Sequence, residues 1–272
     1  MSTILDKIVT QTSEDLSKRK KKISWNDFNS LEGFEKTRVS FKEALTKEGQ
    51  VSIIAEVKKA SPSKGIIRAD FNALKTAHYY EDYGASAISV LTDEPFFKGS
   101  LSYLDKISKE IALPLLRKDF IIDPFQIKEA RAYGADAVLI IVAITDGEQL
   151  NELLAAANEF GLDALVECYD QSDFDRLNFN HVDILGVNNR DLKNFEVDVH
   201  RGISILQQAP TDTVLVSESG LSTGKDIALL RSEGIHSALI GEYFMRQNSP
   251  GLAIKELLEQ ADLEYERSLT DE

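Results

Sequence analysis

The chain has 272 residues, of which 43% are hydrophobic, and a formal net charge of −14 at pH 7. This length exceeds the ~100 to 200 residues of an ordinary domain but suits a barrel of eight βα units, which forms a single domain of about 250 residues. The acidic charge argues against a nucleic-acid-binding surface, and the lack of a long apolar run or signal peptide predicts a cytoplasmic protein with no membrane partner.

Cysteine and histidine usage indicates neither a disulfide framework nor a metal site. Cys168 is the single cysteine, so no intramolecular bridge can form. The four histidines are scattered without the spacing of metal ligands. Cys168 directly follows Glu167 in a predicted strand, so its side chain should point to the opposite face and be buried.

Residues 1–50 precede the first predicted strand. They contain LDKIVTQTSEDLSKRKKK, which predicts one helix with a basic end, and Trp25 follows in a loop. We interpret this segment as a helical extension of the main fold. The KRKKK run could indicate nucleic-acid binding, but a solvated helix end is the better interpretation in a chain this acidic.

One joint recurs along the chain: a helix end, a glycine and a short apolar run. It appears as YGASAISVL from Tyr83, YGADAVLII from Tyr133, FGLDALVEC from Phe160 and EGIHSALIG from Glu233. The glycine suits a left-handed helix cap, and the apolar run suits a strand buried on both faces. With SIIAEV, LPLLRKDF, DILGVNN and VLVSESG, these runs predict strands near residues 52, 87, 115, 137, 164, 184, 214 and 237.

Each stretch between these strands fits one crossover helix. Asp123 places a capping side chain before Pro124, and Asp70 precedes FNALKTAHYYEDYG, which has apolar residues at helical spacing. The pattern predicts an α/β fold, a (βα)8 TIM barrel with an N-terminal helical extension. A doubly wound open sheet is the alternative, but it usually has a Gly-rich first turn, which IAEVKKASPSKG lacks.

The whole chain is expected to form one domain. In this division residues 1–50 are the extension, residues 51–264 the barrel and residues 265–272 a tail, where the last helix frays.

Charged and polar side chains stand at the ends of the predicted strands. Strand residues face the barrel interior alternately, and the carboxyl ends of the strands form the face that holds an active site. The candidates are Glu56, Lys58, Lys118, Glu167, Asn188, Arg190, Glu218 and Ser219. One such residue could be a salt bridge that plugs the barrel, but desolvating each ion costs several kcal/mol, so the whole set predicts a catalytic pocket.

Small residues follow the seventh and eighth strands, in ESGLSTG from Glu218 and LIGE from Leu239. They let backbone N–H groups approach a ligand, and the loops after these two strands form the recurrent phosphate site of this architecture. Ser61 and Ser63 could add hydroxyl donors. Ordinary turn chemistry is the alternative for the glycines. We expect a phosphorylated small-molecule substrate.

Longer motifs occur in a fixed order between the ILDKIV start and about Arg246: IAEVKKASPSKG, SVLTDEPFFKGS, LLRKDF, LVECYD, LGVNNRDL, VSESGL and ALIGEYFMR. In this order they resemble indole-3-glycerol phosphate synthase. The resemblance implies a carboxy-lyase of tryptophan biosynthesis that needs no cofactor. Its substrate would be 1-(2-carboxyphenylamino)-1-deoxyribulose 5-phosphate, closed to indole-3-glycerol phosphate with loss of CO2 and water. The N-terminal helix would help to close over the substrate.

The resemblance also implies residue roles. Lys118 would be the general acid that protonates the ketone oxygen during ring closure. Glu167 and Lys58 would accept and donate protons in the later dehydration. Glu56 and Asn188 would hold these groups and the substrate hydroxyls.

The remaining candidates would bind the substrate. Phosphate would be held by Ser61 and by the backbone of Gly220, Gly241 and Glu242, with Arg190 beside them. The aromatic ring would need an apolar slot, for which the resemblance offers Phe97, Phe120, Leu139, Leu192 and Ile240. On apolarity alone each of these five is more typical of core.

Two rival functions remain open at this point. A Schiff-base aldolase or sugar-phosphate isomerase on the same barrel would use Lys118 or Lys58 to attack a carbonyl. A non-catalytic phosphate-ligand sensor would have little use for so many proton donors and acceptors. The chain is expected to be a monomer or weak homo-oligomer without nucleic acid, and association with other tryptophan-pathway enzymes is left open.

Overall fold

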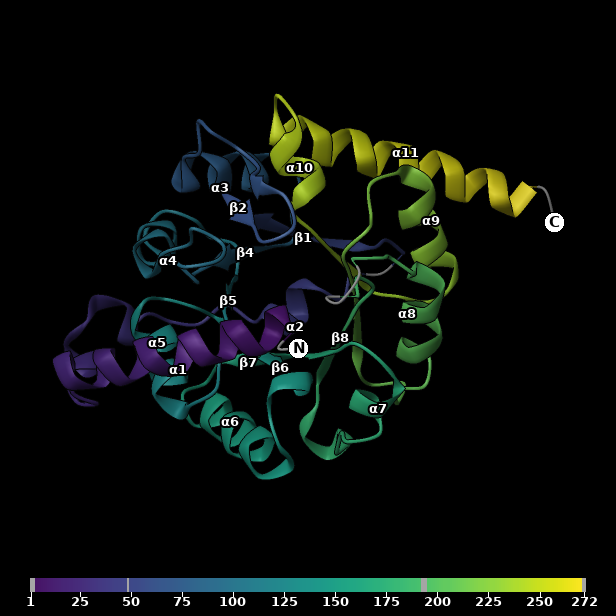
Figure 1. The fold of residues 1–272 in the computed structure, drawn as a ribbon. Helices are drawn as coiled ribbons and strands as arrows, with labels where there is room; N and C mark the ends of the chain where they lie inside the picture. Colours follow the sequence, from purple (N-terminus) through teal and green to yellow (C-terminus); the bar gives the residue numbers. More distant parts are fainter. Residues whose placement is uncertain (1–2, 48, 192–194, 271–272) are drawn as a thin grey trace.

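The computed structural model describes residues 3–47, 49–191 and 195–270, and within them eight parallel strands form a closed barrel (Figure 1). The barrel closes because the first strand pairs with both the second and the last. The predicted TIM barrel is therefore confirmed. Its strands are β1 (Ser52–Val57), β4 (Ala87–Leu91), β5 (Leu115–Lys118), β6 (Ala137–Ile141), β7 (Asp163–Cys168), β8 (Ile184–Asn188), β9 (Val214–Glu218) and β10 (Ser237–Ile240).

Helices surround the barrel, and all but the last two connect successive strands (Figure 1). They are α3 (Ala73–Asp82), α4 (Leu101–Ser108), α5 (Pro124–Ala132), α6 (Gly147–Glu159), α7 (Gln171–Phe174), α8 (Val199–Leu206), α9 (Gly224–Ser232), α10 (Glu242–Arg246) and α11 (Pro250–Thr270). No helix in the described ranges is both long and apolar enough to cross a membrane.

Alternation along the strands divides the core into two layers. In β1, Ile53 and Ala55 belong to the layer between the strands and the helices, whereas Ile54 belongs to the cluster inside the barrel. Glu56, two residues after Ile54, therefore faces the interior at the end of the strand. Cys168 at the end of β7 is fully buried in the outer layer, as predicted.

The N-terminal extension contacts both ends of the barrel. The predicted first helix is confirmed as α1 (Ile4–Lys22), which begins over the middle of the barrel and leads outward past α5 (Figure 1). Two short turns, η1 (Asp27–Ser30) and η2 (Glu32–Phe34), lead to α2 (Phe41–Ala44). The backbone N–H of Phe41 donates to Asp163 at the start of β7. Phe41 and its neighbours thus close the end of the barrel opposite the strand carboxyl ends.

Helix caps follow the sequence signals in part. Asp123 caps α5 as predicted, because its side chain accepts from the Phe125 N–H at 2.9 Å. The helical pattern after Asp70 forms α3, and its N-cap is Asn72, whose side chain accepts from the Lys75 N–H at 3.0 Å. Asp70 instead forms an ion pair with Arg68.

Two further elements differ from the sequence-based expectation. The loop after β1 contains a small antiparallel hairpin of β2 (Ala60–Ser61) and β3 (Gly65–Ile66). Helix α11 continues to Thr270 and so includes most of the segment expected as a tail.

Candidate active site

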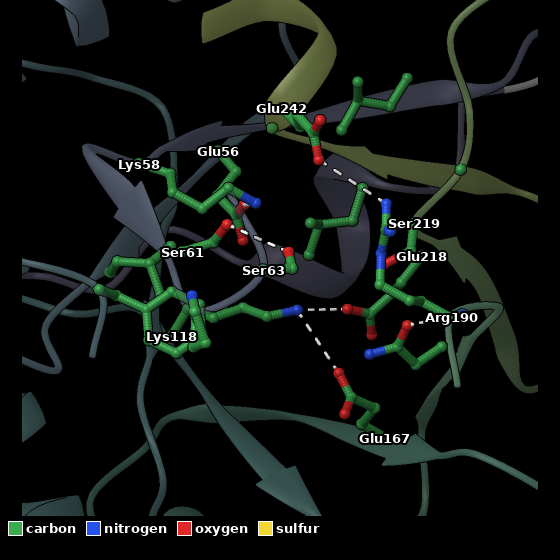
Figure 2. A pocket seen from close by; sticks show the side chains of 18 of the residues that line it. Glu56, Lys58, Ser61, Ser63, Lys118, Glu167, Arg190, Glu218, Ser219 and Glu242 are labelled. Atoms are coloured by element: carbon green, nitrogen blue, oxygen red, sulfur yellow. Dashed lines mark hydrogen bonds and ion pairs between the residues drawn. The ribbon is translucent and has the colours of Figure 1, made fainter. Parts of the chain in front are cut away.

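A cavity of about 430 Å³ opens where the carboxyl ends of the strands meet (Figure 2). Every predicted site residue in the described part of the chain lines it, and Leu192 lies outside the described residues. The lining candidates are Glu56, Lys58, Ser61, Phe97, Lys118, Phe120, Leu139, Glu167, Asn188, Arg190, Glu218, Ser219, Gly220, Ile240, Gly241 and Glu242.

The Lys118 ammonium is the centre of the charged group. It comes from β5, donates to Glu218 of β9, and lies 3.5 Å from Glu167 Oε2 of β7 (Figure 2). Burial alone would lower the pKa of Lys118, but the nearby carboxylates of Glu218, Glu167 and Glu56 raise it above its ordinary value. At neutral pH the cavity therefore presents a protonated lysine.

The surroundings of Glu167 favour the neutral form of its carboxyl group. Burial, and then the negative charge of Glu218, raise the pKa of Glu167 to about 8, although Lys118 acts in the other direction. A carboxyl with a pKa near neutral pH exchanges protons effectively in a catalytic step.

Glu56 forms an ion pair with Lys58, which directly follows β1. Burial favours the neutral form of Glu56, but the charges of Lys58 and Lys118 outweigh it and lower the pKa of Glu56. Two buried carboxyls in one cavity are thus driven in opposite directions, the arrangement by which a single site supplies both an ionised and a protonated carboxyl.

Two glycines leave room for these carboxylates. A Cβ at Gly186 of β8 would overlap Glu218 Oε1, and a Cβ at Gly241 would overlap the side chain of Glu56. The carboxylates therefore lie directly against neighbouring backbone, which limits the positions they can adopt.

The Gly186→Ala variant is expected to lower kcat by roughly tenfold or more, because a displaced Glu218 would no longer hold the Lys118 ammonium in place. The added methyl group would push Glu218 away from Lys118. Gly147→Ala is the matched control, since nothing lies within 4 Å of a Cβ there. Steady-state kinetics of both variants make the test. Equal kcat values for the two would contradict this role of Gly186.

An apolar wall forms one side of the cavity. The rings of Phe97 and Phe120 lie with centroids 6.0 Å apart. The N-terminal helix adds Ile4, Leu5 and Ile8, which the sequence analysis did not name. Their spacing, with two apolar residues at the start and a third one turn later, was the signal that could have identified this covering face.

Small and polar groups form the rim after β9 and β10. Ser219 and Gly220 have φ values of 71° and 80°, and left-handed backbone at a non-glycine residue is uncommon outside functional or strained sites. Arg190 Nη2 lies 3.7 Å from Glu242 Oε2. Arg246, a further lining residue that the sequence analysis missed, pairs with the same carboxylate at 3.0 Å.

Two carboxylates of the cavity converge on a lysine. Within residues 3–47, 49–191 and 195–270, no group of three or more His, Cys, Asp or Glu side chains is arranged to hold a metal ion. The Lys118 ammonium lies where the carboxylates Glu167 and Glu218 converge.

The sequence matches the family model described as indole-3-glycerol phosphate synthase over residues 5–257. The chain belongs to the indole-3-glycerol phosphate synthase family. Proteins of this name from Salinibacter ruber and Zymomonas mobilis subsp. pomaceae are 46% and 43% identical to it. The alignments cover 94% and 95% of this chain, and 95% and 99% of the relatives. A relative from Campylobacter jejuni is 45% identical over 94% of this chain and 100% of its own length.

Two solved structures that resemble this chain carry other names and show the fold alone. A 3-hexulose-6-phosphate synthase from Salmonella typhimurium has a TM-score of 0.63 at 17% identity, over 79% of this chain and 100% of its own. A thiamine phosphate pyrophosphorylase from Pyrococcus furiosus has a TM-score of 0.57 at 13% identity, over 82% and 98%. The indole-3-glycerol phosphate synthase family thus has an architecture that other enzymes share.

Proposed function

We propose that this protein closes 1-(2-carboxyphenylamino)-1-deoxyribulose 5-phosphate to indole-3-glycerol phosphate, as a cytoplasmic carboxy-lyase of tryptophan biosynthesis. The observation that carries the proposal is the buried Lys118 ammonium, held by carboxylates beside an apolar wall. Membership of the indole-3-glycerol phosphate synthase family supports the substrate and the product.

Lys118 acts in ring closure. The ring carbon that bears the carboxylate attacks the ketone carbon, and the ammonium donates a proton to the ketone oxygen as negative charge develops there. A preorganised donor at such an oxygen contributes ~3 to 4 kcal/mol. Phe97 and Phe120 supply the slot that holds the aromatic ring beside Lys118.

Loss of CO2 from the ring carbon that made the attack then restores the aromatic ring. Dehydration follows, in which Lys58 donates a proton to the departing hydroxyl and Glu167 accepts a proton from the adjacent ring methylene carbon, so that water leaves and the indole double bond forms. The raised pKa of Glu167 suits an acceptor that works near neutral pH. Glu56 holds Lys58 in position through their ion pair, and Asn188 contacts the substrate hydroxyls.

The rim of the cavity binds the phosphate. The backbone N–H groups of Gly220, Gly241 and Glu242 act as donors, together with the hydroxyl of Ser61. Arg190 supplies a cationic group on the same side of the cavity. Backbone donors suit this task because they are fixed by the fold before the ligand arrives.

The raised pKa of Lys118 disfavours the rival Schiff-base chemistry, because a lysine must lose its proton before it can attack a carbonyl. Borohydride added during turnover distinguishes the two mechanisms. A covalent lysine adduct would contradict the acid–base role proposed for Lys118.

The direct test mixes purified protein with the proposed substrate and follows the rise of indole fluorescence, without added metal or cofactor. A rise at a rate proportional to protein concentration supports the proposal. Binding of the substrate without any rise would overturn it in favour of a phosphate-ligand sensor.

The pH dependence of the dehydration step should reflect Glu167. Its carboxylate form accepts the proton, so the rate of dehydration, followed by rapid quench, is expected to rise with pH up to the raised pKa of about 8. Because the charge of Glu218 raises that pKa, the Glu218→Gln variant should show the rise at lower pH, whatever its maximal activity. The substrate phosphate, with a second pKa of about 6, titrates equally in both assays. An unchanged inflection would contradict the assignment.

A further inference from the structure

A buried network of charges joins the N-terminal helix α1 to β5, the strand that carries Lys118. We propose that Arg19 and Glu129 are positioning residues that tie the docking of α1 to the orientation of Lys118. The proposal rests on the proposed function for the role of Lys118, whereas the network itself is defined by the geometry below.

Glu129 of α5 is the shared acceptor of this network. Its Oε2 accepts from Arg19 Nη1 at 2.6 Å and from Arg117 Nη2 at 2.9 Å. The side chains of Glu129 and Arg117 are 1% and 0% exposed, and that of Arg19 is 28% exposed. One buried carboxylate oxygen thus joins two guanidinium groups that come from segments almost 100 residues apart in the sequence.

Arg117, which directly precedes Lys118, links Glu129 to other residues near Lys118. Its other hydrogen bonds reach Thr92 Oγ1, at 3.1 Å, and the Gln126 carbonyl, at 2.7 Å. Its Nη2 also donates to Asp119 Oδ2 at 3.0 Å. Because side chains alternate along β5, holding Arg117 on the outer face directs the adjacent Lys118 to the inner face, and the bond to Asp119 holds the residue that follows Lys118.

Asp119 links the network to Phe120 in the apolar wall of the cavity. Its Oδ1 accepts from the Phe120 N–H at 2.9 Å, and the side chain of Phe120 lines the cavity. The path from Arg19 through Glu129, Arg117 and Asp119 therefore ends at the backbone that presents Phe120.

The opposite end of α1 covers the cavity. Ile4, Leu5 and Ile8 line it, whereas Leu16 packs with Phe28 in a small cluster near α5. A shift of α1 would consequently change how the helix covers the cavity. Through Arg19 and Glu129, the same shift would also displace Arg117 of β5.

Lys20 offers a matched control on the same helix. It pairs with Asp123 at 2.6 Å, as close as the Arg19 pair, but its side chain is 43% exposed. Exposed pairs of this kind contribute little to structure, whereas a buried pair constrains its surroundings. Lys20→Met and Arg19→Met each remove one positive charge and leave an apolar side chain of similar length.

Arg19→Lys serves as the rescue variant. Arg19 donates to Glu129 through Nη1, and its buried Nε has no hydrogen-bond partner in the described part of the structure. A lysine ammonium supplies the one charged donor that Glu129 uses, so it should restore most of the constraint.

The experiment compares wild type, Arg19→Met, Arg19→Lys and Lys20→Met by two readouts. Hydrogen exchange of the substrate-free proteins is measured by mass spectrometry on peptides covering residues 115–120, and kcat and KM are measured with the proposed substrate. We expect faster exchange in this segment and a decrease in kcat of about tenfold for Arg19→Met alone, with a smaller change in KM.

The two readouts separate the possible failures. Equal exchange in residues 115–120 for Arg19→Met and Lys20→Met overturns the positioning role, whether or not the protein turns over the substrate. An inactive wild type overturns the proposed function and leaves the exchange result to decide on the network. Faster exchange with unchanged kcat in Arg19→Met contradicts the link between Arg19 and the chemistry of Lys118. An Arg19→Lys variant with the same exchange and kcat as Arg19→Met contradicts it as well.

Discussion

The Lys118→Ala variant is expected to lose ring closure while it retains its fold and binds the substrate. A general acid typically contributes ~10² to 10⁴-fold, and loss of the ammonium also removes charge stabilisation, so kcat should fall by at least about 10³-fold. The protein should tolerate the change because Lys118 holds down the pKa of Glu167, and removing it favours the neutral carboxyl. Indole fluorescence gives the rate, and calorimetry gives substrate affinity.

Lys109→Ala provides the comparison for Lys118→Ala. Lys109 pairs with Asp105 on the surface at 3.2 Å, and its side chain is 45% exposed. This variant should match wild type in kcat and thermal stability. Turnover by Lys118→Ala within a few fold of wild type would refute the role of Lys118, and loss of the unfolding transition would assign it a structural role instead.

The Glu167→Gln variant should bind substrate, close the ring and stop before dehydration. Glutamine keeps the shape of the side chain but cannot accept a proton, so the rate of dehydration should fall by ~10² to 10⁴-fold. The fold should persist, because burial already disfavours the charged form of Glu167. Rapid quench followed by chromatography should detect a ring-closed intermediate that has not lost water.

Glu152→Gln, on the exposed face of α6, makes the same chemical change away from the cavity and should behave as wild type. A slow Glu167→Gln variant that accumulates only unreacted substrate would move Glu167 to the ring-closure step. Full activity of the Glu167→Gln variant would contradict any role of Glu167 in proton transfer.

The barrel was predictable because its signals are local. Each strand is a short apolar run bounded by polar residues, and a glycine such as Gly84 or Gly134, with φ of 98° and 87°, marks the helix end before it. The charged site was predictable for a related reason. Once the strands are placed, the fold alone brings their carboxyl ends together, so Lys118 and Glu218 meet although they lie 100 residues apart.

Other features depend on contacts that no local pattern specifies. Arg117 lies in the same LLRKDF run as Lys118, but its fully buried pairing with Glu129 is decided by how α5 packs on β5. The basic run after Leu16 was interpreted as a solvated end, yet Arg19 and Lys20 reach acidic partners on the barrel. The charges of Arg19 and Lys20 follow from the sequence, but the acidic residues that they contact in the fold do not.

The closed barrel also makes enzyme activity a probe of folding. Glu56 is held on β1, which pairs with β10 from the other end of the chain, whereas Lys118 comes from β5, which lies between them in the sequence. An open or partly assembled sheet would leave these charges apart, and contacts between distant parts of a chain form late because loop closure is entropically costly. During refolding, the return of turnover should therefore lag behind the return of helical circular dichroism and mark the moment at which the first and last strands join.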